Sequence, residues 1–163
     1  MIPVPGHLKA VWHPELTRDG FLKGNIVCPC GGEVFHASDN ENSPSRGYGE
    51  DGLLIQAACV RCGAVCVIVD EAEHGYDGFV CHSYQKADPG TLHPHLCGCG
   101  SSQFRMTVSI EPEDEEQFVE EVVAEEPDAF QPEDFVNAFG WITIDTQCAD
   151  CGVLENWIDL ETA

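Results

Sequence analysis

The chain has 163 residues, of which 29 are Asp or Glu and seven are Lys or Arg, so its formal net charge at pH 7 is −22. This negative field repels nucleic-acid phosphates and anionic lipids, so direct binding of DNA, RNA or a membrane is disfavoured. No run of apolar residues approaches the roughly 18 that a membrane helix needs, and the N-terminus lacks the apolar stretch of a signal peptide. We therefore expect a cytoplasmic protein that attracts basic partners.

The N-terminal segment, residues 1–25, precedes the first cysteine and contains several large apolar side chains, among them Leu8, Val11 and Trp12. A segment of this composition is too short to bury these side chains by itself. We expect it to pack onto the first of the two units described next.

Four short cysteine pairs, each followed by glycine, occur along the rest of the chain. Their sequences are Cys-Pro-Cys-Gly, Cys-Val-Arg-Cys-Gly, Cys-Gly-Cys-Gly and Cys-Ala-Asp-Cys-Gly. Two such pairs supply the four thiolates of a tetrahedral Zn²⁺ site, and glycine permits the positive φ that such turns need. The candidate ligands are Cys28, Cys30, Cys59 and Cys62 for a first site, and Cys97, Cys99, Cys148 and Cys151 for a second.

The two halves of the chain are similar to each other. A shift of 69 residues places the first cysteine pair and Phe35 on the third pair and Phe104. A shift of 89 residues places the second pair and Asp70 on the fourth pair and Asp159, so the second half carries a 20-residue insertion. Self-similarity of this kind predicts a duplicated structural unit.

Segments in which polar and apolar residues alternate flank the cysteine pairs. This period of two is the pattern of a half-buried β-strand. We expect a three-stranded antiparallel sheet in each unit, with strands at 33–38, 53–58 and 64–69 in the first and at 103–110, 141–146 and 153–160 in the second.

The two units resemble the zinc-ribbon class of folds, in which two cysteine-containing turns, each followed by glycine, are joined by β-strands. The resemblance implies a small metal-bound, mainly β protein: a duplicated zinc ribbon with two structural Zn²⁺ ions. The first ribbon spans residues 26–72, a connection spans 73–94, and the second ribbon spans 95–163. The leading pairs have one residue between the cysteines where zinc ribbons commonly have two. Zinc ribbons serve many functions, so the fold implies no single activity.

Other chemistry of the cysteines stays open at this point. Paired thiols in a reducing compartment bind metal more often than they form disulfides, while a redox pair and an iron site are alternatives. Cys66 and Cys81 lie outside the pairs, and we expect Cys66 to act as a small buried apolar side chain. Cys81 next to His82 suggests a nucleophile with its base, but neighbouring residues on a strand point to opposite faces. We expect a protein that is not an enzyme, with a thiol oxidoreductase as an alternative.

An acidic insertion, residues 111–137, distinguishes the second unit from the first. It has 12 acidic residues and no Lys or Arg between Glu111 and Asp134, and its apolar residues recur at helical spacing. The pattern predicts a short acidic helix whose carboxylates attract a basic protein and whose apolar stripe anchors it. The alternative is that the stripe covers the ribbon core and the carboxylates solvate the exterior. The candidate contacts are Glu115, Glu116, Phe118, Glu120, Glu121 and Val122.

The histidines between and beside the units are not needed as ligands, because two sets of four thiolates are already complete. We expect the linker histidines His74, His82, His93 and His95 to lie on the surface. The most concrete functional expectation is a non-catalytic zinc protein that binds a basic protein partner, such as an immunity or inhibitor protein that masks a nuclease toxin. A zinc-ribbon adaptor of the transcription or translation machinery is the alternative.

Overall fold

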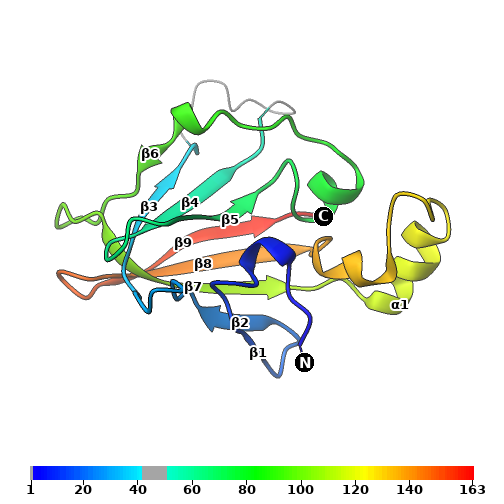
Figure 1. Cartoon of the computed structure of the whole chain (residues 1–163), viewed down its shortest axis with the longest axis horizontal. Coiled ribbons are helices and arrows are strands. Elements are labelled where there is room, and N and C mark those ends of the chain that lie inside the picture. The colour runs from blue at the N-terminus through cyan, green and yellow to red at the C-terminus, as the bar shows by residue number, and fades with distance from the viewer. Residues whose placement is uncertain (1, 42–50) are drawn as a thin grey trace.

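The computed structural model describes residues 2–41 and 51–163, and in this part of the chain the strands form one curled antiparallel sheet (Figure 1). A mainly β fold is therefore confirmed. The strands are β1 (Glu15–Leu16), β2 (Leu22–Asn25), β3 (Phe35–Asp39), β4 (Leu54–Cys59), β5 (Val65–Asp70), β6 (His93–Pro94), β7 (Gln103–Glu111), β8 (Trp141–Cys148) and β9 (Leu154–Glu161).

Helical segments in the described residues are short. They are the 3₁₀ turns η1 (Gly6–Leu8), η3 (Pro89–Thr91) and η5 (Pro132–Val136), the α-helix α1 (Glu115–Phe118), and the π-helical turns η2 (Tyr76–Val80) and η4 (Val119–Val123). The acidic helix consists of α1 and η4 in direct succession. Asp114 caps its N-terminus, because Asp114 Oδ1 accepts a 2.8 Å hydrogen bond from the Gln117 N–H. No helix in the described residues is both long and apolar enough to span a bilayer.

The two expected three-stranded sheets are parts of one sheet and not separate sheets. The meanders β3–β4–β5 and β7–β8–β9 are joined because β3 pairs with β7. Phe35 lies opposite Phe104 in this pairing, and these two residues are equivalent in the two halves. The halves therefore meet about a local pseudo-twofold axis. Because β3 pairs with β7, neither meander leaves this side of its first strand unpaired.

Each half also lends a strand to the other. β2 precedes the first cysteine pair in sequence but pairs with β7, and β6 precedes the third cysteine pair but pairs with β3. The hydrogen bonds repeat with the 69-residue shift: Ile26 N–H donates to Met106 O at 2.9 Å, and His95 N–H donates to Ala37 O at 2.8 Å. The halves are thus intertwined through their leading strands, and these two hydrogen bonds join equivalent positions of the halves.

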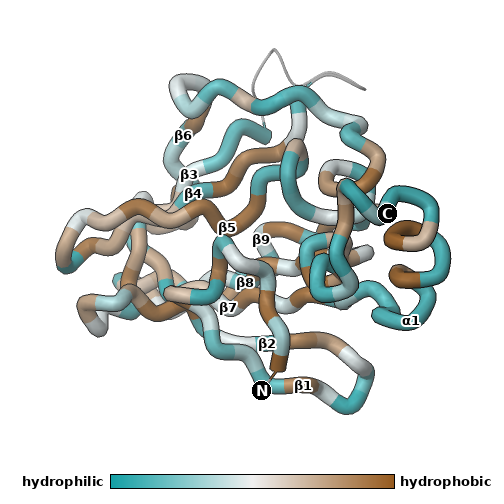
Figure 2. The backbone as a smooth tube through the Cα atoms, turned by 45° about the vertical axis from the view of Figure 1, so that its right-hand side comes forward, coloured by the Kyte–Doolittle hydropathy of each residue, from teal (hydrophilic) through white to brown (hydrophobic). Residues whose placement is uncertain are grey.

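Most of the apolar side chains of both halves pack into one cluster inside the curled sheet, and Figure 2 shows the hydrophobic residues of β4 and β5 that contribute to it. The N-terminal segment adds Leu8 and Trp12, both fully buried. It contacts the first unit, because His7 Nε2 donates to Ile68 O at 2.9 Å, and the second unit, because β2 pairs with β7. This segment therefore connects the two halves.

A second, smaller cluster lies beside α1. It consists of Phe118, Val122, Phe130 and Ala138, with side chains of η2 packed against it. Figure 1 shows α1 and the segment that follows it at the end of the molecule near the C-terminus. The apolar side chains of the acidic insertion thus form a small second core together with η2 and Ala138.

Candidate metal centres

The cysteine pairs lie in tight turns beside the ends of strands. In the first turn Cys28 N–H donates to Gly32 O and Gly31 N–H donates to Cys28 O, both at 2.8 Å. Gly31 has a φ of 89° and Gly63, in the second turn, a φ of 77°, which is the left-handed region that favours glycine. The third and fourth turns repeat this geometry. The turns bend the chain so that the thiols of each pair point the same way.

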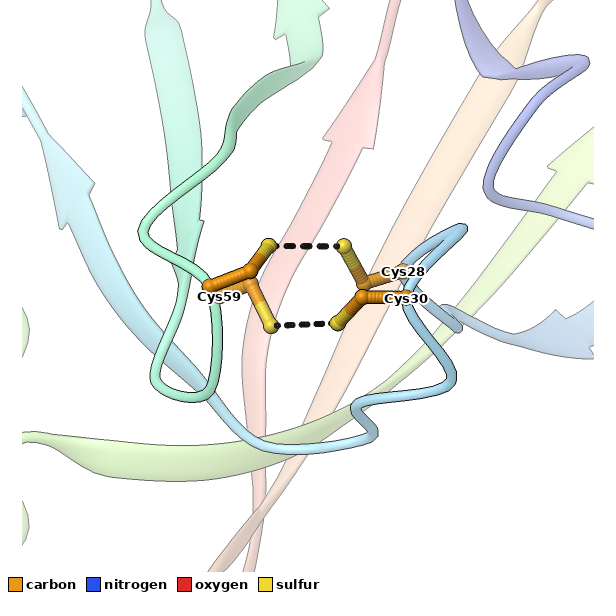
Figure 3. Close-up of side chains that lie close together, drawn as sticks. Cys28, Cys30 and Cys59 are labelled. Atoms are coloured by element: carbon orange, nitrogen blue, oxygen red, sulfur yellow. Dashed lines mark hydrogen bonds between the residues drawn. The ribbon is translucent and has the colours of Figure 1, made fainter.

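The first centre brings its four sulfur atoms together (Figure 3). The Sγ atoms of Cys28 and Cys62 are 3.5 Å apart and those of Cys30 and Cys59 are 3.6 Å apart. All four Sγ atoms lie within 4.8 Å of one another. The sequence predicted that these four residues form one site, and the structure brings them together.

The second centre has the same dimensions. The Sγ atoms of Cys97 and Cys151 are 3.5 Å apart, and those of Cys99 and Cys148 are 3.6 Å apart. These distances exceed the S–S bond of about 2.05 Å, so none of these pairs is a disulfide. Four thiolates at about 2.3 Å from a tetrahedral ion lie about 3.8 Å apart, so both clusters fit one metal ion each.

Burial alternates in both centres. Cys28, Cys59, Cys97 and Cys148 are buried, whereas the other cysteine of each pair is exposed. Each centre therefore lies at the surface, with one side against the core. A four-thiolate set leaves no open position for water or substrate, which is the arrangement of a structural metal site.

The thiols of one centre differ in acidity. A hydrogen bond from the Cys62 N–H lowers the pKa of Cys59 to about 7, and one from the Cys151 N–H lowers the pKa of Cys148 to about 6. The Cys30 N–H also lowers the pKa of Cys28, but desolvation and the neighbouring thiols outweigh this and raise it to about 12. Crowded thiols cannot all ionise alone, so a bound cation is needed to hold four thiolates together.

The two centres differ in the charge of one residue within their second cysteine pair. In the first, Arg61 Nη1 donates to Cys30 O at 3.4 Å, and in the equivalent position of the second lies Asp150. With a divalent ion bound, Arg61 would partly offset the net negative charge of the four-thiolate centre. The second centre has an acidic residue there instead.

The two remaining cysteines have different surroundings. Cys66 is partly buried against the main core, and burial raises its pKa to about 11. Such a thiol is a weak nucleophile at neutral pH. Cys81 is exposed and follows η2.

The expected partner contacts divide into two groups. Glu115, Glu116, Glu120 and Glu121 are exposed, as a binding surface needs. Phe118 and Val122 are 1% and 6% exposed, because they form the small core of the insertion. In this structure these two side chains are therefore not exposed for contact with a partner.

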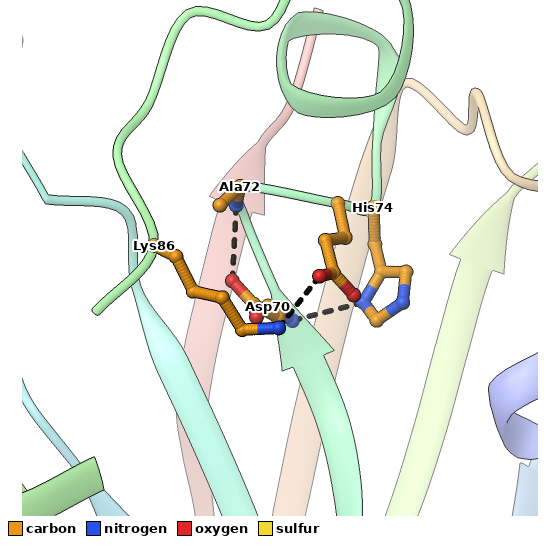
Figure 4. A network of polar contacts seen from close by, with 5 residues as sticks. Asp70, Ala72, His74 and Lys86 are labelled. Carbon is orange, nitrogen blue, oxygen red and sulfur yellow. Dashed lines mark hydrogen bonds and ion pairs between the residues drawn. The ribbon is translucent and has the colours of Figure 1, made fainter. Parts of the chain in front are cut away.

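Two histidines expected on the surface are packed against other rings. His74 stacks on His7 with ring centroids 3.5 Å apart, and its Nδ1 accepts a 3.0 Å hydrogen bond from the Asp70 N–H (Figure 4). Beside it, Lys86 Nζ donates to Glu73 at 2.7 Å. Burial, together with the charges of His7 and Lys86, lowers the pKa of His74 to about 3. His74 is therefore a neutral structural residue.

His95 is the other packed histidine. Its ring stacks on Trp157 with centroids 4.2 Å apart and lies 4.8 Å from the ring of Phe104. Its Nε2 is 3.5 Å from Glu155 Oε2. The sequence does not reveal this contact, because Trp157 lies more than 60 residues away in the chain. The 69-residue repeat was the available signal, since it aligns His95 with the buried Ile26.

Comparison with known proteins gives no relative: no protein-family model, curated protein or solved structure matches this chain. The functional conclusion therefore depends on the chain itself. In the described residues, the two four-cysteine clusters are the groups whose geometry suits a metal ion.

Proposed function

We propose that this chain is a non-catalytic zinc protein built from two intertwined units of the zinc-ribbon class, and that it binds a basic protein through its acidic insertion. Zn²⁺ is the ion that four thiolates in a closed tetrahedral set favour. The ten free cysteines suit a reducing compartment such as the cytoplasm. In this proposal the two ions stabilise the fold and the acidic surface performs the function.

The exposed carboxylates of the acidic helix are the observation that carries the proposal. Glu115, Glu116, Glu120 and Glu121 lie on a short helix whose apolar side faces its own small core. The helix is held by packing against this small core, so the carboxylates are presented on an ordered element and not on a loose tail. Charges arranged in this way steer and select a basic partner more than they add affinity. A nuclease toxin, whose own surface binds phosphates, is one partner of this chemistry.

The test is capture of a basic protein at low and high salt. The immobilised chain is expected to retain a basic protein at about 50 mM salt and to release it at about 0.5 M, because screening weakens contacts between exposed charges. The captured protein is then purified and its affinity measured directly.

Two matched variants assign the binding surface. The first replaces the four helix glutamates by glutamine, and the second replaces Glu15, Asp19, Glu33 and Glu161, which are also exposed, by their amides. We expect the first to weaken binding about tenfold or more and the second to weaken it by less than about threefold. Equal losses, or no basic protein retained at low salt, contradict the proposal.

A further inference from the structure

The duplication makes it possible to compare equivalent positions of the two halves, and they differ beside the leading strands. In the first half, Ile26 and Val27 follow β2. The N-terminal segment covers the side of their backbone that faces away from β7, which we call the outer edge. Val27 N–H donates to Val11 O at 2.8 Å, Trp12 pairs with Ile26, and Trp12 Nε1 donates to Gly24 O at 3.0 Å. The N-terminal segment thus covers this edge through one β-bridge at the end of the turn that follows η1.

The equivalent edge in the second half has no such cover among the described residues. Leu96 is equivalent to Val27, but its side chain is 59% exposed and its N–H makes no hydrogen bond within the described part of the chain. Beside it is a hollow of about 620 Å³. We call this hollow the β6–β9 groove; its lining includes Asp39, Glu41, His93, Leu96, Glu155 and Trp157.

The chemistry of the groove has changed from apolar to acidic between the halves. Val108 and Ile110, which pack in the main core with the N-terminal segment, correspond to Asp39 and Glu41 of the groove. In the same way, Cys66 and Ile68 correspond to Glu155 and Trp157. The apolar set packs with Leu8 and Trp12 in the main core, so the acidic set is suited to a different occupant.

Three properties of the groove select a cationic occupant. Its carboxylates attract Lys and Arg side chains, and among the described residues no Lys or Arg lines it. Trp157 offers an indole ring, the best aromatic partner of a cation, and its stacking on His95 holds that ring in place. A second copy of this chain fits poorly, because two molecules of charge −22 repel each other.

We propose that the β6–β9 groove binds an extended segment of a partner protein that carries lysine or arginine at alternate positions, by strand addition to the outer edge at Leu96. Leu96 N–H donates to a carbonyl of the segment, as Val27 N–H donates to Val11 O in the first half. Alternate side chains of the segment then point toward Glu41 and Glu155. The proposal rests on the proposed function for the basic character of the partner, but it uses a surface separate from the acidic helix.

Peptide binding tests the groove directly. The probe is a fluorescein-labelled peptide in which arginine alternates with threonine, and its control is the same peptide with every second backbone nitrogen methylated. We expect the methylated peptide to bind about tenfold or more weakly, because it cannot complete the strand pairing. In addition, hydrogen exchange of the Leu96 amide, followed by NMR, is expected to slow when the unmodified peptide binds.

A pair of charge-matched variants locates the site. Glu155→Lys places a cation in the groove, while Glu161→Lys makes the same charge change on the same strand outside the groove. We expect Glu155→Lys to weaken peptide binding about tenfold and Glu161→Lys to weaken it by less than about threefold. Glu41→Lys provides a second groove variant if the first does not fold. Equal losses for groove and control variants, or unchanged exchange at Leu96, overturn the proposal.

The outcomes also separate this proposal from the proposed function. If a basic protein is captured through the acidic helix but the peptide does not bind, the groove proposal alone fails. If the peptide binds but no basic protein is retained, the proposed function fails. A dimer of the free protein that protects the Leu96 amide would show that a second copy occupies the groove, and this too overturns the proposal.

Discussion

The cysteines differ in how much metal binding and stability the protein is expected to lose when one of them is replaced, although all ten are free thiols. The eight paired cysteines approach one another within ligand distance in two groups of four. Cys66 lies near the first group but packs against apolar side chains, and burial raises its pKa to about 11. Whether a cysteine of this chain can act as a metal ligand or packs as an apolar side chain depends on the turn that holds it and on its neighbours.

Replacing one thiol of a pair therefore differs from replacing Cys66. Cys148→Ser is expected to reduce the zinc content from two ions to one per chain, because a three-thiolate set holds Zn²⁺ less tightly. It should also lower the free energy of unfolding by about 3 kcal/mol or more. Cys66→Ser should keep both ions. Native mass spectrometry measures the zinc content, and two ions in Cys148→Ser would contradict the assignment.

His74 is a titratable residue that is kept neutral by its surroundings. Its pKa is lowered to about 3 from an ordinary value of 6.5, first by burial and then by the neighbouring His7 and Lys86. Because the folded-state pKa is lowered, the unfolded chain binds the proton first as the pH falls. The stabilisation is therefore present above pH 6.5 and is lost between pH 6.5 and 3.

The variant His74→Asn isolates this effect, since its side-chain oxygen can replace Nδ1 as the acceptor for the Asp70 N–H. Between pH 7.5 and 5.5 the wild-type protein is expected to lose about 1.4 kcal/mol more stability than the variant, because one further proton binds only to its unfolded state. Urea unfolding at the two pH values measures this difference. Equal losses in both proteins would show that His74 has an ordinary pKa in the fold.

Among the elements, the acidic insertion shows most clearly what a sequence pattern leaves open. Helical spacing of apolar residues predicted a short helix in the insertion, and α1 with η4 forms it. The same spacing did not reveal what the apolar side faces. It faces Phe130, which lies later in the insertion, and Ala138, which directly follows the insertion. The spacing of apolar residues shows which side of the helix is apolar. The residues that this side contacts depend on how the following loop folds back.

Phe118→Ala tests whether the insertion has its own core. Removing this fully buried ring leaves a cavity beside Phe130, so we expect a loss of about 3 kcal/mol of stability in the insertion. Glu116→Ala, on the exposed side of the same helix, should change stability by less than about 0.5 kcal/mol. Hydrogen exchange of the helix amides measures the local effect. Similar exchange in the two variants would argue against a separate core.

At the scale of the whole molecule, the connections between the halves lay beyond prediction from sequence. The cysteine pairs and the alternating strands were readable because each signal is confined to a few neighbouring residues. The partner of β2 is β7, some 80 residues away, and nothing in the composition of Leu22–Asn25 specifies it. Because these signals are local to each unit, they predicted two ribbons with separate sheets. The exchange of leading strands joins them into one sheet.

This exchange predicts that loss of one metal centre weakens both halves. In Cys148→Ser the second centre is broken, but β7 still supplies partners to β2 and β3. Disorder in β7 therefore exposes the backbone of the first half as well. We expect faster hydrogen exchange at Ala57, in β4 of the intact first half, and a single calorimetric transition at a lower temperature. The reciprocal variant Cys59→Ser should raise exchange at Ile144 in β8. Two separate transitions, with unchanged protection of the half that keeps its metal, would show that the halves fold independently and that the shared sheet contributes little to their stability.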